Sequence, residues 1–250
     1  MIGRILWLVA LLGIAAITAA LQLDRQSETE PQLIPFVPGS SRNYAQAQLT
    51  ASTLERGDPA TVLADARELV LRRPMPAEHL TLLAAAQARA GDADAAEFTI
   101  QLAAQRGWRE PVAQETMLRL ALAAGDKAEA ARRYAALFRA QGTPDALLVE
   151  LGPQVLDEPD GVGRKTFADI IVAAPRWHEQ FLQRGVQVLT PFEFSVVTSI
   201  SLQEGAAFDC PQLGQSIEAL ARRDAGAARR LSIAASGLCR DLAPPGLFPL

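Results

Sequence analysis

The sequence predicts an all-α protein in which helix–turn–helix pairs follow a single apolar helix at the N-terminus. Three observations support this fold class. The chain is 49% hydrophobic but only 6% aromatic, and it is rich in Ala and Leu, which are strong helix formers. A Gly-Asp dipeptide recurs at a fixed spacing in the first half of the chain, and an uncharged apolar run lies near Met1. The 250 residues are enough to bury a sizeable core.

The apolar run extends from Ile5 to Leu23 and is 19 residues long. As a helix it would measure about 28 Å, which is close to the hydrocarbon thickness of a bilayer. Arg4 and the amino terminus precede the run, whereas Asp24 and other acidic residues follow it. By the positive-inside rule, residues 1–23 are predicted to be a single-pass anchor in a bacterial inner membrane, with the N-terminus cytoplasmic and the remaining chain periplasmic.

Two other interpretations of this run stay open. Thr18-Ala19-Ala20 has the small residues of a signal-peptidase site, so that the run would be a long signal peptide. The run could also be a buried core helix, although no polar stripe interrupts it. The anchor and the signal peptide both export the rest of the chain.

Residues 24–42 differ in composition from both of their neighbours. They contain Pro31, Pro35 and Pro38 among charged and polar residues. Prolines at this spacing oppose helix and favour extended backbone. We therefore expect a Pro-rich linker here, up to roughly 60 Å long when fully extended.

The Gly-Asp dipeptide indicates a repeated structural unit. It occurs three times with 34 residues between successive copies, at Gly57-Asp58, Gly91-Asp92 and Gly125-Asp126. Large apolar residues stand eight positions before each glycine, and apolar residues recur five, nine and twelve positions after it, at helical spacing. Each glycine is expected to end a helix in the left-handed conformation. Each aspartate is expected to accept from the amides that open the next helix.

A 34-residue helix–turn–helix with Gly at the turn, a small residue five positions later and a bulky one nine positions later resembles the tetratricopeptide repeat. The resemblance covers residues 43–144 as three units and implies a right-handed α-solenoid. The chain departs from the family pattern where an aromatic residue is expected four positions before each glycine, since Thr53, Gln87 and Ala121 stand there.

The resemblance also implies a groove for a protein or peptide partner, lined by the first helix of each pair. The candidate lining residues, chosen by helix position, are Tyr44, Glu78, Thr81, Arg89, Glu115 and Arg119. The paired basic residues with which members of this family clamp a C-terminal carboxylate are missing from the matching places.

The C-terminal third continues the helical pattern without the period. Residues 145–240 are expected to form divergent helical pairs that cap the solenoid, and residues 241–250 a non-helical tail. Thr143 is expected to cap the helix that opens this region, and Gly185 to end a short helix over residues 177–184. Residues 192–202 alternate like a strand, but Thr190-Pro191-Phe192-Glu193 has the form of a capping box, so we predict a helix.

Cys210 and Cys239 flank the last predicted hairpin. Because its two helices would be antiparallel, both cysteines would lie at its open end, where a disulfide would hold the terminal pair together. The alternative is a pair of buried free thiols.

Residues that could carry catalysis are scarce. His79 and His178 are the only histidines and have no Cys or acidic cluster near them in sequence, so no metal, cofactor or catalytic residue is predicted. The segment from Gly161 to Thr166 resembles a phosphate-binding loop only weakly, because Arg164 replaces the glycine before the lysine. A net charge of −4 gives no basic face for nucleic acid.

We therefore expect a non-enzymatic scaffold or adaptor that binds a protein partner in the periplasm, in envelope assembly, secretion or polysaccharide export. A secreted carbohydrate-associated or enzyme-accessory module is the alternative, with Trp108, Trp177 and the Phe192–Phe194 pair as aromatic platforms. A hydrolase with an unrecognised site is the third and weakest possibility.

Overall fold

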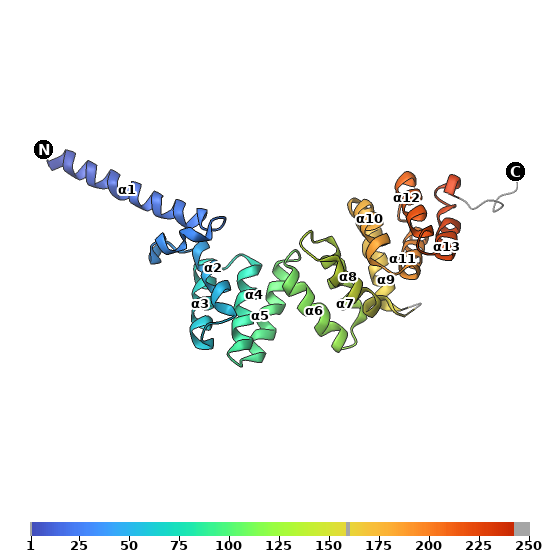
Figure 1. Ribbon diagram of the computed structural model, residues 1–250, viewed down its shortest axis with the longest axis horizontal. Helices are drawn as coiled ribbons and strands as arrows, with labels where there is room; N and C mark the ends of the chain where they lie inside the picture. The colour runs from blue at the N-terminus through green and yellow to red at the C-terminus, as the bar shows by residue number, and fades with distance from the viewer. Residues whose placement is uncertain (1, 159–160, 243–250) are drawn as a thin grey trace. The chain divides into compact units, whose positions relative to one another are not determined.

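The computed structural model describes residues 2–158 and 161–242, which are helical with short connections (Figure 1). Those ranges contain no strand, which confirms the all-α prediction. The chain divides into two compact units, Met1–Gly107 (unit 1) and Trp108–Leu250 (unit 2). The boundary falls inside the second of the three units expected from the 34-residue spacing.

Unit 1 consists of a long N-terminal helix, two 3₁₀ turns and two helical hairpins. Its elements are α1 (Ile2–Gln26), η1 (Pro31–Phe36), η2 (Gly39–Ser41), α2 (Tyr44–Leu54), α3 (Pro59–Arg72), α4 (Ala77–Arg89) and α5 (Ala93–Arg106). Helix α4 packs against α2, α3 and α5. A small apolar core of Val62, Ala66 and Ala86 lies between the hairpins, with leucines packed around it.

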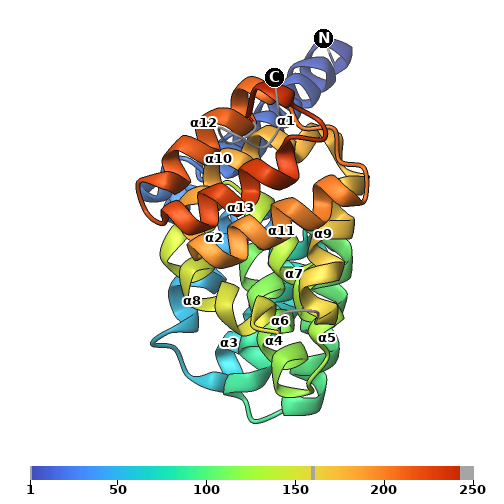
Figure 2. The same cartoon turned by 90° about the vertical axis from the view of Figure 1, so that its right-hand side faces the viewer.

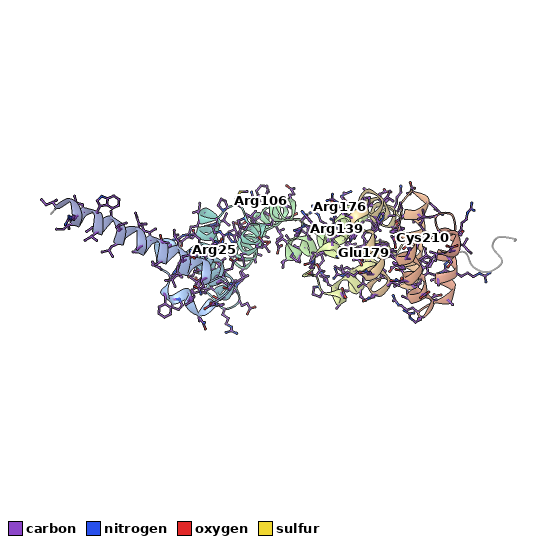
Figure 3. The ribbon with its side chains drawn as sticks, turned by 90° about the horizontal axis from the view of Figure 1, so that it is seen from above. Arg25, Arg106, Arg139, Arg176, Glu179 and Cys210 are labelled. Atoms are coloured by element: carbon purple, nitrogen blue, oxygen red, sulfur yellow. A yellow bond between two sulfur atoms is a disulfide. The ribbon has the colours of Figure 1, made fainter. Side chains whose placement is uncertain are left out.

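Helix α1 is long and apolar enough to cross a membrane, and a signal sequence would have the same properties. Its 25 residues correspond to about 38 Å of helix. Its apolar side chains project away from the rest of unit 1 (Figure 3), and none in the most apolar stretch is buried. The core-helix interpretation is therefore wrong, because a core helix would have its apolar surface covered.

The segment from residue 24 to 42 is folded, so the prediction of an extended linker is wrong. Asp24 still belongs to α1, is only 2% exposed, and accepts hydrogen bonds from the backbone amides of Asn43 at 2.9 Å and Ala45 at 3.0 Å. The prolines take part in the 3₁₀ turns η1 and η2. Their fixed φ suits the first turn of a helix as well as extended backbone, which is why composition alone did not separate the two.

The predicted aspartate caps are all present. The side chains of Asp58, Asp92 and Asp126 accept from the backbone amide three residues later, at 3.1, 3.2 and 2.9 Å respectively. Each cap opens the second helix of its hairpin.

The glycines before these caps differ from one another. Gly91 and Gly125 have φ angles of +83° and +73°, as expected for a left-handed helix end. Gly57 has no positive φ, so the prediction is wrong at this turn. A Cβ on Gly57 would lie 2.7 Å from both the Thr53 carbonyl oxygen and Val62 Cγ2. Glycine is therefore required there by close packing rather than by backbone conformation.

The described residues of unit 2 form eight α-helices with short 3₁₀ turns. Its elements are α6 (Pro111–Ala123), α7 (Lys127–Arg139), α8 (Asp145–Leu156), α9 (Val162–Ala173), η3 (Pro175–Trp177), α10 (His178–Val188), α11 (Pro191–Gln203), α12 (Cys210–Ala221), α13 (Ala225–Ala235) and η4 (Arg240–Leu242). Helix α7 packs against α6, α8 and α9, and α13 lies between α11 and α12 (Figure 2). The predicted non-helical tail begins in the 3₁₀ turn η4, and the rest of it, residues 243–250, lies outside the described residues.

The core of unit 2 is built around aromatic side chains. Tyr134, Phe138, Phe167, Trp177 and Phe181 are buried, and ring centroids within this aromatic cluster are 5.4–6.1 Å apart. Burial raises the pKa of the Tyr134 hydroxyl well above its ordinary range, and that hydroxyl donates to the Leu148 carbonyl at 2.9 Å. Edge-to-face contacts of this kind add to the stabilisation from burial itself.

The ends of the helices in unit 2 confirm some predictions and correct others. Residues 191–203 are helical, with the Thr190–Glu193 capping box formed in both directions. Gly185 lies inside α10 and does not end it. A Cβ at this position would lie 3.1 Å from the Phe194 ring, so the glycine allows α10 and α11 to pack closely. Thr143 does not cap α8; Pro144 takes the capping position and leaves no side-chain cap.

The glycines of the loop-like segment 161–166 open helix α9 instead of forming a phosphate loop. The helix begins at Val162, inside this segment. A Cβ on Gly163 would collide with the Val155 carbonyl oxygen. This glycine is therefore needed where α9 passes α8 closely.

Cys210 and Cys239 are joined by a disulfide with their Cα atoms 5.7 Å apart. Cys210 opens α12 (Figure 3), and Cys239 follows α13. The geometry is that of the predicted bridge across the open end of the terminal hairpin.

Candidate interaction surface

Two of the four candidate groove residues of unit 1, Tyr44 and Arg89, make contacts within the fold of that unit. The Tyr44 ring lies under the Arg73 guanidinium, with 3.8 Å between the ring centroid and Cζ. Arg89 donates to the carbonyls of Leu54 and Gly57, with 3.1 Å to the latter, and so satisfies the end of α2. Glu78 is exposed and Thr81 is half-buried. The structure does not bring these four residues together into one site.

Glu115 and Arg119, by contrast, lie together on α6. Arg119 Nε is 2.9 Å from Glu115 Oε1, and Arg119 Nη2 is 3.0 Å from Glu150 Oε1 on α8. Hydrogen bonds to Glu115 and then to Glu150 raise the pKa of Arg119, so its charge is permanent. The arginine thus bridges two helices that are not adjacent in sequence.

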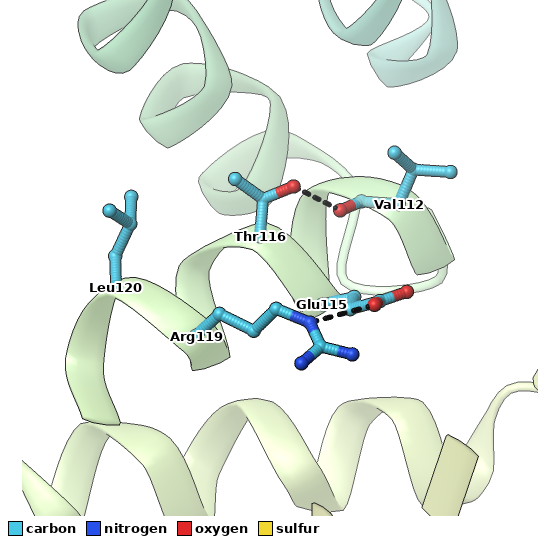
Figure 4. Close-up of a pocket in the computed structure, with 5 residues that line it drawn as sticks. All are labelled: Val112, Glu115, Thr116, Arg119 and Leu120. Atoms are coloured by element: carbon cyan, nitrogen blue, oxygen red, sulfur yellow. Dashed lines mark hydrogen bonds and ion pairs between the residues drawn. The ribbon is translucent and has the colours of Figure 1, made fainter. Parts of the chain in front are cut away.

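A shallow hollow of about 390 Å³ lies beside this ion pair. Val112, Thr116 and Leu120 follow one another at four-residue spacing along α6, next to the Glu115–Arg119 pair (Figure 4). Val112 is 56% exposed and Leu120 is 40% exposed. We call these five residues together with Glu150 the α6–α8 surface.

The α6–α8 surface combines exposed apolar side chains with charges that are held in place. Exposed apolar side chains gain from being covered, and oriented ion pairs next to them select the partner's charge and register. This combination suits reversible binding of a protein surface.

Sequence reasoning identified only part of this surface. The four-residue spacing of Val112, Thr116 and Leu120 is visible in the sequence and would have indicated an exposed stripe. Glu150 carries no such signal, because its contact with Arg119 depends on how α8 packs beside α6.

Neither histidine lies on the α6–α8 surface. His79 is buried with Nδ1 2.8 Å from the Arg73 carbonyl oxygen, and burial is the main cause that lowers its pKa. His178 is buried with Nε2 2.9 Å from the Ile171 carbonyl oxygen. Over the described ranges no group of three or more His, Cys, Asp or Glu side chains is placed to hold a metal ion.

Of the proposed aromatic platforms, Trp177 and Phe194 are buried in the core of unit 2 and are not available to a ligand. Trp108 is 43% exposed and Phe192 is 47% exposed. Arginine guanidinium groups lie over both exposed rings. A sugar that stacks on the same ring faces would have to displace these guanidinium groups.

Comparison of the chain with protein-family models, with curated proteins and with solved structures finds no match.

Proposed function

We propose that this chain is a membrane-anchored scaffold that holds a protein partner in the periplasm, with residues 5–23 in the bilayer. The length and apolar surface of α1 support the anchor. The Cys210–Cys239 disulfide supports an oxidising compartment, since such bridges are rare in the cytosol.

The proposal includes a tetratricopeptide-like solenoid. Three hairpins share the same Asp cap at the same 34-residue spacing, and two of them share a left-handed glycine. Within unit 2, α6 and α8 are the first helices of successive pairs. The Arg119–Glu150 ion pair links them, as expected if first helices lie side by side and line a groove.

The α6–α8 surface is the observation that carries the binding function. Its apolar residues Val112 and Leu120 are exposed beside Arg119, which is ion-paired to Glu115 on α6 and to Glu150 on α8. A partner with an apolar patch flanked by charge would cover it.

The contact between α1 and α2 supports a scaffold held near the bilayer surface. Asp24 lies at the end of the apolar helix and caps α2 directly, so no long linker separates the anchor from the first hairpin. Cleavage after Ala20 would leave Asp24 in the mature chain, and the proposed secreted form would keep this cap.

Photo-crosslinking in cells tests the binding function. A photoreactive amino acid at position 116 should give a defined adduct, and Leu120→Asp should abolish it by placing a charge in the apolar contact. Ile233→Asp on α13 is the matched control, because Ile233 is 45% exposed. An adduct that survives Leu120→Asp, or that Ile233→Asp removes equally, contradicts the proposal.

Protease protection on spheroplasts, combined with membrane fractionation, tests the location. We expect a full-length, membrane-bound chain that is digested only from outside, with the cysteines oxidised on a non-reducing gel. A protected chain with free thiols would place the helical pairs in the cytoplasm and contradict the proposal.

A further inference from the structure

A second hollow in unit 2 shares no lining residue with the α6–α8 surface. It has a volume of about 550 Å³, and its lining includes Trp108, Arg109 and Pro111 before and at the start of α6, Arg139 at the end of α7, and Gln180 on α10. Gln141 and Gly142, in the loop after α7, complete its polar wall. Among the described residues, no acidic side chain lines it.

Two guanidinium groups are stacked on the indole ring of Trp108. Arg109 Cζ lies 4.6 Å and Arg139 Cζ 4.9 Å from the ring centroid. Stacking occupies the face of a guanidinium but leaves its N–H edge available for a planar oxyanion. The ring therefore orients two positive groups toward the same hollow.

Both arginines are exposed and lack a protein acceptor among the described residues. Arg119 and Arg184 differ from them, since Arg119 pairs with Glu115 and Glu150 and Arg184 pairs with Asp145. Two acidic residues close to this segment in the sequence or on α10 have partners of their own. Glu110 caps α6 through the Ala113 amide, and Glu179 accepts from Gln183.

The backbone around Arg139 is held in place by its neighbours. The Gln180 side chain donates to the Arg139 carbonyl at 3.4 Å, and Arg139 Cζ lies 5.8 Å from the buried Trp177 ring. Little ordering of this segment is therefore needed before a ligand binds.

We propose that this hollow binds the carboxylates of an acidic peptide segment of a protein partner. Two oriented guanidinium groups can each make a bidentate pair with a carboxylate, which is the strongest hydrogen-bonding geometry available to arginine. The polar amide of Gln141 and the open backbone at Gly142 suit a peptide main chain. The stacked arginines cover the Trp108 ring, which disfavours a neutral sugar. Neither this site nor the α6–α8 surface requires the other.

Binding of an acetylated, amidated hexaglutamate peptide to the full-length protein in detergent micelles tests the proposal. We expect saturable binding that weakens with added salt and is at least tenfold weaker in the Arg109→Gln/Arg139→Gln double variant. Arg222→Gln/Arg229→Gln, which also removes two exposed charges, is the matched control and should bind within twofold of the parent protein. Far-UV circular dichroism confirms that both variants fold.

The fluorescence of Trp108 provides an independent measurement of peptide binding at the site. Peptide binding should change the tryptophan fluorescence, and Trp108→Phe should remove that change and weaken binding, because Phe stacks a guanidinium less well.

Three outcomes would overturn the proposal. One is equal binding by the two double variants, and another is equal binding of a hexaglutamine peptide. The third is tighter binding of an oligogalacturonate than of hexaglutamate, which would assign the site to an anionic saccharide. The Leu120→Asp variant should bind hexaglutamate normally, so failure of this proposal is distinguishable from failure of the α6–α8 surface.

Discussion

Unit 1 and unit 2 are both built from helical pairs, yet their interiors differ in kind. The described buried apolar side chains of unit 1 are aliphatic, among them Val62, Leu69 and Ile100 with many alanines, and the polar residues Thr50 and His79 are buried as well. The core of unit 2 is a continuous apolar cluster centred on aromatic rings. Small side chains bury less apolar area than aromatic rings and contribute correspondingly less.

The difference teaches that unit 2 has stabilising features that unit 1 lacks among the described residues. In both units, side chains satisfy backbone groups across elements: in unit 1 Asp24 caps α2 and Arg89 closes the end of α2, and in unit 2 Arg184 donates to the carbonyls of Phe138 and Thr143. Unit 2 adds the aromatic cluster and a disulfide. We expect unit 1 to open at lower free energy, which segment-resolved hydrogen exchange can measure.

Phe138→Ala should have the largest effect and should act on unit 2. Phe138 is fully buried and contacts four aromatic rings, so the loss in the free energy of unfolding should be about 3–5 kcal/mol. Exchange should accelerate in peptides from residues 127–238 and stay unchanged in residues 44–106. Phe98→Ala on α5 is the control, because Phe98 is 63% exposed and its loss should change little. Equal effects of the two substitutions would contradict a packed aromatic core.

Removing the disulfide should have the next largest effect, again in unit 2. Cys210→Ser/Cys239→Ser opens a covalent loop with a sequence separation of 29 residues, and the expected loss is about 2–4 kcal/mol. Reduction of the parent protein should reproduce the result in thermal melts followed by circular dichroism. Unchanged melting in both experiments would show that packing alone holds the terminal hairpin.

Asp24→Ala should destabilise unit 1 and leave unit 2 unchanged. The buried carboxylate accepts from the amides of Asn43, Tyr44 and Ala45, and its removal leaves those donors without their acceptor. The expected loss is about 1–3 kcal/mol, read as faster exchange in α2. Asp24→Asn keeps one acceptor oxygen, so its stability should lie between that of the parent protein and that of Asp24→Ala. Glu28→Ala removes a nearby exposed charge and should have no such effect; a matching effect there would assign the loss to charge.

Gly91 and Gly57 should respond differently to the same pair of substitutions. A Cβ at Gly91 would meet no other atom within 4 Å, but the φ angle of +83° is unfavourable for a residue with a Cβ. Gly91→Ala should therefore lower the free energy of unfolding by about 1–2 kcal/mol, and Gly91→Asn by less, because Asn tolerates this conformation. At Gly57 the obstacle is contact with Thr53 and Val62, so Asn should be no better than Ala. Thermal melts of the four variants check the pattern, and an Asn that rescues Gly57 would contradict the steric explanation.

The sequence predicted what depends on local pattern. The helix at residues 191–203, the three aspartate caps and the pairing of Cys210 with Cys239 follow from capping and spacing, and the structure has all of them. Prediction from the sequence failed where the structure of a residue depends on a distant neighbour. Asp24 was assigned to a linker because the three amides that donate to its carboxylate lie about twenty residues away. Gly57 has the same sequence context as the other two turn glycines, and only its contact with Val62 distinguishes it.

The candidate site shows the same limit. The positions of Glu115 and Arg119 on one helix face could be predicted from their four-residue spacing. The contact of Arg119 with Glu150 and the stacking of Arg139 on Trp108 could not, because each joins elements about thirty residues apart. The identity of a partner depends on such contacts, and spacing within one helix does not reveal it.

Lowering the pH should produce the smallest effect, confined to unit 1. Burial lowers the pKa of His79 below its ordinary value of 6.5, so the unfolded chain takes up a proton at a higher pH than the folded unit does. The stability from neutral His79 is therefore fully present above pH 6.5 and is lost as the pH falls through that value toward the folded pKa.

Hydrogen exchange of the α4 segment, corrected for the intrinsic rate at each pH, should show this loss between pH 8 and 5.5. The range stops there because burial raises the pKa of Asp65, which acts in the opposite direction at lower pH. His79→Gln should flatten the dependence on pH, whereas His178→Gln in unit 2 should leave it in place. If the exchange rate still depends on pH in the His79→Gln variant, another group of unit 1 titrates. The buried histidine would then not explain why unit 1 is more sensitive to pH than unit 2.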